Sequence, residues 1–182
     1  MTIEEYFELD RKSTDVRYEY IDGYVRLLAG ETLDHATVSF NIARTLHALL
    51  RESPCRVYNS DVKVRLPGNR VVYPDVTVTC GQQEDGQSDI LLAPCVIVEV
   101  LSPSTEDFDR GRKFTYYRQL PTIQEYVLID PQHPSVEVFR RERRNLWMLY
   151  IFSLEDELYL TSLNVHFPVA ALYEDVTLSS EE

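Results

Sequence analysis

One acidic residue, Glu99, lies inside the most apolar stretch of the chain, residues 95–101. This stretch is apolar at odd and even positions alike, which is typical of a strand that is buried on both faces. The two-residue period of a strand places the Glu99 side chain on the same face as Ile97 and Leu101. Because an unpaired buried carboxylate costs several kcal/mol, Glu99 requires a proton, a salt bridge or a bound cation.

A second carboxylate, Asp75, lies within residues 71–78, where alternation places it with Tyr73 and Thr77 on one face. Two carboxylates on adjacent strands repel each other unless a divalent cation lies between them. A salt bridge from Glu99 to an arginine or lysine is an equally good explanation of the buried charge. The sequence therefore predicts either a metal site or a buried ion pair.

Lys113 is the candidate cation for this site. It follows Glu99 by one helical segment and lies early in a predicted helix, so its amine is able to reach the carboxylates. The alternative is a functionally silent pair with Asp109 or Tyr117, each four residues away on a solvated helix face. Both interpretations stay open at this stage.

The elements that position these residues follow from hydrophobic periodicity and turn signals. Thr2 is the expected N-cap of a helix over residues 3–12, with Glu5 in the capping-box position. The dipeptide Asp22-Gly23 suits the type I′ turn of a hairpin within residues 16–28. The longest helix is expected to begin with Asp34 as its N-cap and to end before Pro54.

Residues 56–66 are predicted as one alternating strand that turns through residues 67–69 into a second strand over residues 71–79. The buried strand, a helix over residues 109–120 and a strand over residues 125–129 then form a crossover unit.

Strands are also expected over residues 136–140, 146–152 and 158–160, the last two as a final hairpin. The predicted fold class is α/β, with a mixed sheet flanked by the helices that start at Asp34 and Asp109. Residues 1–182 are expected to form a single domain.

Composition restricts the classes of function. The chain has 182 residues, of which 44% are hydrophobic, so it is long and apolar enough to bury a core. Its net charge of −12 opposes non-specific binding to nucleic acid unless positive charge is concentrated locally. Basic residues do form two clusters, the second of which is interpreted as a solvated hairpin turn. The clusters are Arg110, Arg112, Lys113 and Arg118, and Arg140, Arg141, Arg143 and Arg144.

The cysteines and the hydropathy pattern suggest a location. Cys55, Cys80 and Cys95 are odd in number and have no CxxC spacing, so we expect reduced thiols in a cytoplasmic protein. No apolar stretch is long enough to cross a bilayer, and the N-terminal residues do not resemble a signal peptide. We therefore expect no membrane partner.

Four motifs together form a pattern that resembles a known family. They are YEYIDG at residues 18–23, YPDV at 73–76, VEVLSPST at 98–105 and DRGRK at 109–113. Pro-Asp, a buried glutamate and a following lysine resemble the PD-(D/E)XK nuclease superfamily. In detail the motifs are similar to the Uma-type restriction endonuclease family, which is abundant in cyanobacteria, over roughly residues 3–139.

The resemblance implies a restriction-endonuclease-like core over about residues 16–141, with an N-terminal helix and hairpin and a C-terminal hairpin. It implies Mg²⁺ or Mn²⁺ held by Asp75, Glu99 and the backbone carbonyl of Val100. Lys113 would orient a water or stabilise charge on the phosphate. Glu19 would hold a second or water-mediated metal.

Three residues bear on this pattern, namely Leu101, Glu19 and His35. The superfamily signature has lysine two residues after the glutamate, whereas this chain has Leu101, and Lys113 is expected to replace that lysine from the following helix. The alternative for Glu19 is a surface pair with Arg17 or Arg26. His35 is interpreted as a cap-region histidine rather than a phosphate contact.

The function implied by the resemblance is metal-dependent hydrolysis of phosphodiester bonds in DNA by an endonuclease. A homodimer is the default expectation for a soluble oligomer. The alternative is a catalytically inactive protein that keeps the nuclease fold as a binding or scaffold module. A nucleotide hydrolase is disfavoured, because the sequence has no GxxxxGK[ST] phosphate loop.

Overall fold

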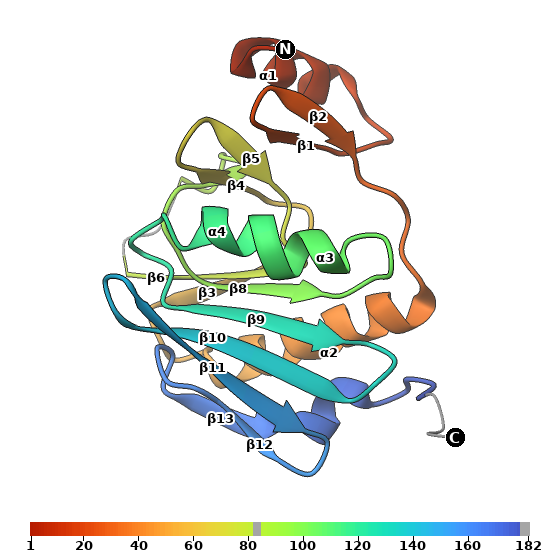
Figure 1. Ribbon diagram of the computed structural model, residues 1–182, viewed down its shortest axis with the longest axis vertical. Helices are drawn as coiled ribbons and strands as arrows, with labels where there is room; N and C mark the ends of the chain where they lie inside the picture. The colour runs from red at the N-terminus through yellow and green to blue at the C-terminus, as the bar shows by residue number, and fades with distance from the viewer. Residues whose placement is uncertain (82–84, 179–182) are drawn as a thin grey trace.

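The centre of the molecule is a six-stranded mixed sheet, seen in a computed structural model that describes residues 1–81 and 85–178 (Figure 1). The predicted loop over residues 82–89 lies partly outside the described residues. In the sheet β8 and β9 are parallel neighbours, while the other pairs are antiparallel. The order is β11 (Leu146–Ser153), β10 (Ser135–Arg143), β9 (Glu125–Asp130), β8 (Pro94–Val100), β6 (Val76–Cys80) and β3 (Cys55–Asn59).

Helices cover both faces of this sheet, as predicted (Figure 1). One face packs on α2 (Leu33–Leu49) and on η2 (Val169–Tyr173), a short 3₁₀ helix. The other face packs on one helical run made of α3 (Glu106–Phe108), the π-helical turn η1 (Asp109–Lys113) and α4 (Phe114–Tyr117). Along β8, Val96, Val98 and Val100 face α2, while Ile97 and Leu101 face the helical run. The mixed α/β fold and the doubly buried strand are thus confirmed.

The N-terminal elements form a separate layer at the top of Figure 1. The helix α1 (Ile3–Lys12) has the predicted capping box between Thr2 and Glu5. The hairpin turns at Asp22 (φ 51°) and Gly23 (φ 90°), the two positive φ values of a type I′ turn. It belongs to a five-stranded sheet in the order β2 (Tyr24–Leu27), β1 (Tyr18–Ile21), β5 (Arg70–Val72), β4 (Lys63–Leu66) and β7 (Ile90–Leu91).

The prediction of one strand over residues 56–66 and one over 71–79 is wrong. A turn after Asn59, closed by the Val62 amide that donates to the Asn59 carbonyl, separates β3 from β4. Pro74 and Asp75 separate β5 from β6 in the same way. As a result β4 and β5 pair in the five-stranded sheet, whereas β3 and β6 pair in the six-stranded sheet.

The predicted hairpin of residues 146–152 with 158–160 is also wrong. β11 pairs instead with β10, as its outer neighbour. β12 (Glu157–Leu160) pairs with β13 (Val165–Pro168) in a two-stranded sheet beside the main one. Leu158 and Leu160 are fully buried there, so the burial of β12 against the main core outweighs pairing with β11.

The expectation of three reduced cysteines is contradicted by a disulfide between Cys55 and Cys80. The reason is the register of β3 on β6, which places these two residues directly opposite each other. Only Cys95 is a free thiol among the described residues. Residues 25 apart in the chain give no sign of this pairing, because it depends on strand register.

Two further expectations concern the helices. The long helix begins two residues earlier than predicted, because its N-cap is Thr32 and not Asp34. The Thr32 side chain accepts a hydrogen bond from the His35 amide at 3.2 Å. Within residues 1–81 and 85–178, none of the helices has the length and apolar character needed to span a bilayer.

Candidate functional site

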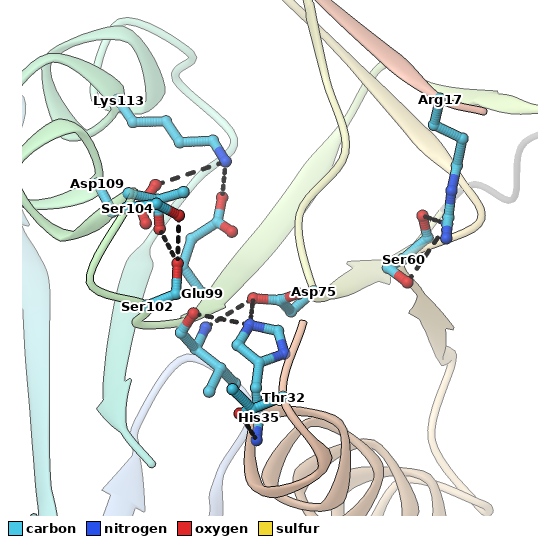
Figure 2. Close-up of polar contacts among 12 residues, drawn as sticks. Arg17, Thr32, His35, Ser60, Asp75, Glu99, Ser102, Ser104, Asp109 and Lys113 are labelled. Atoms are coloured by element: carbon cyan, nitrogen blue, oxygen red, sulfur yellow. Dashed lines mark hydrogen bonds and ion pairs between the residues drawn. The ribbon is translucent and has the colours of Figure 1, made fainter. Parts of the chain in front are cut away.

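The residues predicted to do chemistry all line one small cavity of about 50 Å³ at the end of β8 (Figure 2). The cavity therefore brings together segments that are far apart in the sequence. The lining residues with functional groups are Glu19, Arg26, Glu31, His35, Tyr73, Asp75, Glu99, Val100, Thr105, Asp109 and Lys113.

Strand pairing explains why Asp75 and Glu99 meet. β6 and β8 are antiparallel with Val76 opposite Val98, and one further step of this register places Asp75 opposite Glu99. Opposed residues of an antiparallel pair extend to the same face of a sheet. Asp75 lies in the bend before β6, and its Oδ2 accepts the Val100 amide at 2.7 Å, which fixes the carboxylate beside the end of β8.

Lys113 reaches the carboxylates from η1, on the layer that covers this face. Its Nζ lies 2.8 Å from Glu99 Oε1, 3.1 Å from Glu19 Oε1 and 3.6 Å from Asp109 Oδ1. The side chain is only 6% exposed, so this is a buried ion-pair network and not the solvated helix pair considered for Lys113. The salt bridge considered for Glu99 is therefore present in the structure.

Tyr117 completes the surroundings of Glu99. Its hydroxyl donates to Glu99 Oε1 at 2.6 Å, and its side chain is fully buried. Lys113 and Tyr117 are four residues apart, so they lie on one face of the helical run and contact the same oxygen. Figure 2 shows the second Glu99 oxygen on the side of the carboxylate away from Lys113. This arrangement holds Glu99 in one orientation.

Glu19 is a buried member of the site and not a surface carboxylate. Its Oε1 accepts the Tyr73 amide at 3.2 Å in addition to Lys113. Its Oε2 is buried and has no hydrogen-bond partner among the described residues. The alternative pairing with arginine is wrong, because Arg17 pairs with Asp61 at 2.8 Å and Arg26 lies over the ring of Phe108. A buried carboxylate oxygen without a donor indicates a missing cation, proton or water.

Acidic groups outnumber basic groups around the cavity. Five carboxylates line it, against one lysine, one arginine and one histidine. Burial raises the pKa of Glu99 well above its ordinary value, although Lys113 acts in the opposite direction. Burial also raises the pKa of Asp109 and of Glu31.

The same surroundings stabilise the charged form of Lys113, as its raised pKa shows. Burial alone would lower the pKa of Lys113, but the charges of Glu19 and Glu99 hold it well above its ordinary value. Lys113 is therefore a permanent ammonium group. The lysine, the arginine and the histidine together number fewer than the five carboxylates, so a proton or a further cation would be needed to balance the remaining charge.

His35 lines the cavity, although the sequence analysis interpreted it as a cap-region residue. It lies in the first turn of α2, and its Nε2 is 2.9 Å from the Val100 carbonyl oxygen and 3.4 Å from Asp75 Oδ2 (Figure 2). Burial alone would lower the pKa of His35, but the hydrogen bond to Asp75 raises it. Its contacts span 65 residues of sequence, so no local pattern identifies it. Asp109, four residues before Lys113, was considered only as a surface partner.

Comparison with known proteins places this site in a family. The family model Uma2, described as "Putative restriction endonuclease", matches residues 3–170. The chain belongs to the Uma2 family. The matched region contains every residue of the site and extends beyond the resemblance seen in the sequence motifs.

Two relatives of this Uma2 chain come from Synechocystis sp. (strain ATCC 27184 / PCC 6803 / Kazusa), and both are described as uncharacterized. The protein slr1290 is 30% identical over 171 residues, which are 93% of this chain and 90% of the relative. The protein sll1609 is 30% identical over 152 residues, which are 82% and 85% of the two chains. The family assignment thus rests on nearly full-length similarity.

A solved structure shares the fold of the Uma2 chain. It is the crystal structure of "a putative nuclease belonging to DUF820" from Anabaena variabilis ATCC 29413, with a TM-score of 0.79 and 20% identity. The alignment covers 96% of this chain and 98% of the other. At this identity the similarity concerns the fold, and it confirms the predicted mixed α/β architecture.

The oxygen donors of this Uma2 site can be compared with the ligands that a divalent ion prefers. Nowhere in residues 1–81 and 85–178 do three or more His, Cys, Asp or Glu side chains form a ready-made metal site. Mg²⁺, however, commonly takes only one or two carboxylates, together with waters and substrate phosphates. Asp75, Glu99 and the Val100 carbonyl supply oxygen donors of this kind, and the unpartnered Glu19 oxygen adds negative charge. The residues therefore fit a divalent ion.

Proposed function

We propose that this protein is a metal-dependent endonuclease of the PD-(D/E)XK type that hydrolyses phosphodiester bonds in DNA. The observation that carries the proposal is the convergence of Asp75, Glu99 and Lys113 in one buried cavity, from three separate elements. The family description, and the fold shared with the Anabaena variabilis protein described as "a putative nuclease", support it.

The carboxylates have the binding role in this proposal. Asp75 and Glu99 would hold Mg²⁺ or Mn²⁺ together with the Val100 carbonyl, because hard divalent ions prefer oxygen ligands. When bound, such an ion supplies Lewis acidity toward the scissile phosphate and makes a bound water more acidic. The Val100 amide fixes the orientation of Asp75, and Tyr117 fixes that of Glu99.

Lys113 and Glu19 have the remaining roles. The Lys113 ammonium is held by carboxylates on several sides, so it presents a fixed positive charge to phosphoryl oxygens on which negative charge develops. The free oxygen of Glu19 is an acceptor for a water or a second cation. Arg112, the exposed neighbour of Lys113, takes no part in this network.

The proposal is tested by incubating the protein with supercoiled plasmid in Mg²⁺, in Mn²⁺ and in chelator. We expect nicking or linearisation with the metals and none with chelator. Asp75→Asn and Glu99→Gln should lose the activity, whereas the exposed Glu52→Gln should keep it. Linear single-stranded DNA and RNA tested in parallel define the substrate class.

The second candidate is a binding module that keeps the fold without turnover. The observation that favours it is the net charge of −12, which opposes close approach of a polyanion. Folded protein that cleaves none of the DNA and RNA substrates in either metal would support this candidate and contradict the enzyme.

The homodimer expected from the sequence stays a prediction. The surface that supports it is β11, an outer strand of the six-stranded sheet with exposed apolar side chains on both of its faces. These side chains are Leu146, Met148, Leu149 and Ile151.

A further inference from the structure

A cavity of about 630 Å³, outside the candidate site, is lined by positive charge. It lies between the segment that follows α4 and the turn that joins β10 to β11, and it is called the basic cavity below. Three arginines line it, Arg118, Arg141 and Arg144, together with Asn145 and Trp147. The described residues of its lining include no aspartate or glutamate. This concentration of positive charge stands out in a protein with a net charge of −12.

Arg141 is the fixed centre of the basic cavity. Its guanidinium group donates to the backbone carbonyl oxygens of Ile123 at 2.8 Å, Arg118 at 3.0 Å, Leu120 at 3.1 Å and Arg144 at 3.1 Å. One side chain therefore holds together the segment after α4 and the β10–β11 turn. Because these acceptors are neutral, the hydrogen bonds do not balance the charge of Arg141.

The surroundings of Arg141 remove water without supplying a negative charge. The guanidinium carbon lies 4.4 Å from the centroid of the Trp147 ring. Burial lowers the pKa of Arg141, yet an arginine stays charged in proteins. The neighbouring carboxylate, Glu142, accepts the Tyr150 hydroxyl at 3.2 Å, and Tyr150 packs on the other face of the sheet. An anion in the basic cavity would thus meet a positive charge that water screens only in part.

Arg118 and Arg144 are available to a ligand. Both side chains are exposed, and within the described part of the chain their guanidinium groups form no ion pair or hydrogen bond. Arg118 contacts only the ring of Phe114, at 5.7 Å from its centroid. Their backbones are fixed by Arg141, so the two guanidinium groups stay at the same cavity. The planar fork of donors in a guanidinium group matches the oxygens of a phosphate.

The basic cavity and the catalytic cavity lie on the same side of the main sheet, the side of the helical run. Glu99 is level with Leu128 in the pairing of β8 with β9, whereas the Arg141 amide donates to the Gln124 carbonyl at 2.8 Å. The four residues from Gln124 to Leu128 span about 13 Å of strand. In Figure 1 the β10–β11 turn accordingly lies at the opposite end of the sheet from the arrowhead of β8. Phosphates of one DNA strand follow each other at about 3.4 Å along the axis, so this distance is about four nucleotides.

We propose that the basic cavity binds a phosphate of the nucleic-acid backbone, about four nucleotides from the bond at the catalytic cavity. The binding site stands on its own geometry, but the spacing to a cleaved bond rests on the proposed function. An acidic protein segment is the other polyanion that such charge attracts. Nucleic acid is the better match, because phosphate fits the guanidinium fork and the same ligand can reach both cavities.

The test compares two double variants that change the net charge equally. Arg118→Gln/Arg144→Gln alters the basic cavity, and Arg11→Gln/Arg65→Gln alters two exposed arginines outside it. The probe is a fluorescent DNA duplex long enough to span both cavities, in chelator so that no cleavage occurs, and anisotropy is followed over a salt series. The slope of log affinity against log salt should become shallower by about two in the first variant, one for each lost phosphate contact. It should stay as in wild type in the second variant.

Cleavage gives a second readout, which also tests the spacing. With the long duplex and metal, Arg118→Gln/Arg144→Gln should raise KM and leave kcat nearly unchanged, since the contact is made equally in the ground state and the transition state. A short duplex that ends before the basic cavity should be cut alike by this variant and by wild type. Both double variants should keep the wild-type melting temperature, because the exchanged side chains are exposed.

The outcomes separate this inference from the proposed function. Equal salt slopes in the two double variants would overturn the basic cavity as a phosphate site, and so would a wild type that does not bind the duplex at low salt. Polyglutamate that binds as tightly as DNA, with the same dependence on Arg118 and Arg144, would overturn the choice of nucleic acid. A wild type that cuts no substrate, but whose DNA binding still depends on these arginines, would overturn the proposed function and support the binding site.

Discussion

Lys113 reaches Glu99 from a helix because the position expected for the lysine belongs to the core. Leu101, two residues after Glu99, is 4% exposed and packs with Ile97 and Tyr117 between the sheet and the helical run. An ammonium group at that position would be buried among apolar side chains without a partner. Lys113 extends instead from the helical run that covers this face of the sheet, and its amine pairs with Glu19 and Glu99.

The role of Lys113 is tested by Lys113→Met. The phosphodiester cleavage rate should fall by about a hundredfold to a thousandfold, the usual effect of losing one electrostatic donor in a transition state. The free energy of unfolding should also fall, by about 3 to 5 kcal/mol, because buried carboxylates lose their partner. Cleavage assays at a temperature where both proteins are folded, and urea titrations, measure the two effects.

Arg112→Met is the matched control, since it removes a neighbouring positive charge from the exposed side of the same turn. It should leave both the cleavage rate and the stability nearly unchanged. If Lys113→Met cleaved as fast as Arg112→Met, Lys113 would have only a structural role.

At the scale of elements, the π-helical turn η1 places two charged side chains in the cavity. It carries Asp109 and Lys113, both buried toward the cavity, inside a helical run that continues to Tyr117. π-helical turns are uncommon and occur frequently at functional sites, where they redirect side chains. The sequence predicted a helix here but not the change of its pitch.

The pairing of β3 with β6 predicts a measurable disulfide. Alkylation of the unfolded, unreduced protein followed by mass analysis should find one modified cysteine, Cys95, and alkylation after reduction should find three. Cys55→Ser should lower the free energy of unfolding by about 3 to 4 kcal/mol, because the bond closes a loop across a separation of 25 residues. Cys95→Ser is the control and should be nearly neutral. Three thiols that react without reductant would contradict the bond.

At the scale of the whole molecule, half of the eight residues in the two basic clusters, Lys113 among them, make contacts within the protein. Arg110 pairs with Glu106 and Glu137. Arg140 donates to Glu125, and Arg141 donates to backbone carbonyl groups. The other four residues of the clusters, Arg112, Arg118, Arg143 and Arg144, are exposed. Binding of nucleic acid has to overcome the net charge of −12, and these exposed arginines are available to contact phosphates.

Metal binding should stabilise the whole fold. At a hundredfold excess over its dissociation constant, Mn²⁺ should add about 2.7 kcal/mol to the free energy of unfolding. For a chain of this size the melting temperature should then rise by about 5 to 11 °C. Asp75→Asn should remove most of this rise, whereas Glu52→Gln should keep it. A melting temperature that does not respond to millimolar Mn²⁺ or Mg²⁺ would contradict a metal site.

The local features of this protein were determined by its sequence. The capping box of α1, the type I′ turn at Asp22 and the burial of β8 depend on neighbours a few residues away, so periodicity and turn chemistry predict them. A charged residue inside an apolar strand is also a local feature that the sequence shows directly. Glu99 was found for that reason, and Asp75 and Lys113 followed from their spacing and from the family motifs.

The long-range features were decided by the tertiary structure. The partner of β11, the two sheets that share residues 55–80 and the Cys55–Cys80 bond all depend on which strands pair and in which register. The contact of His35 with Val100 depends on how α2 packs on the sheet. Hydrophobic period fixes the face that a strand or helix buries, but several partners can cover that face, and only packing of the whole core selects among them.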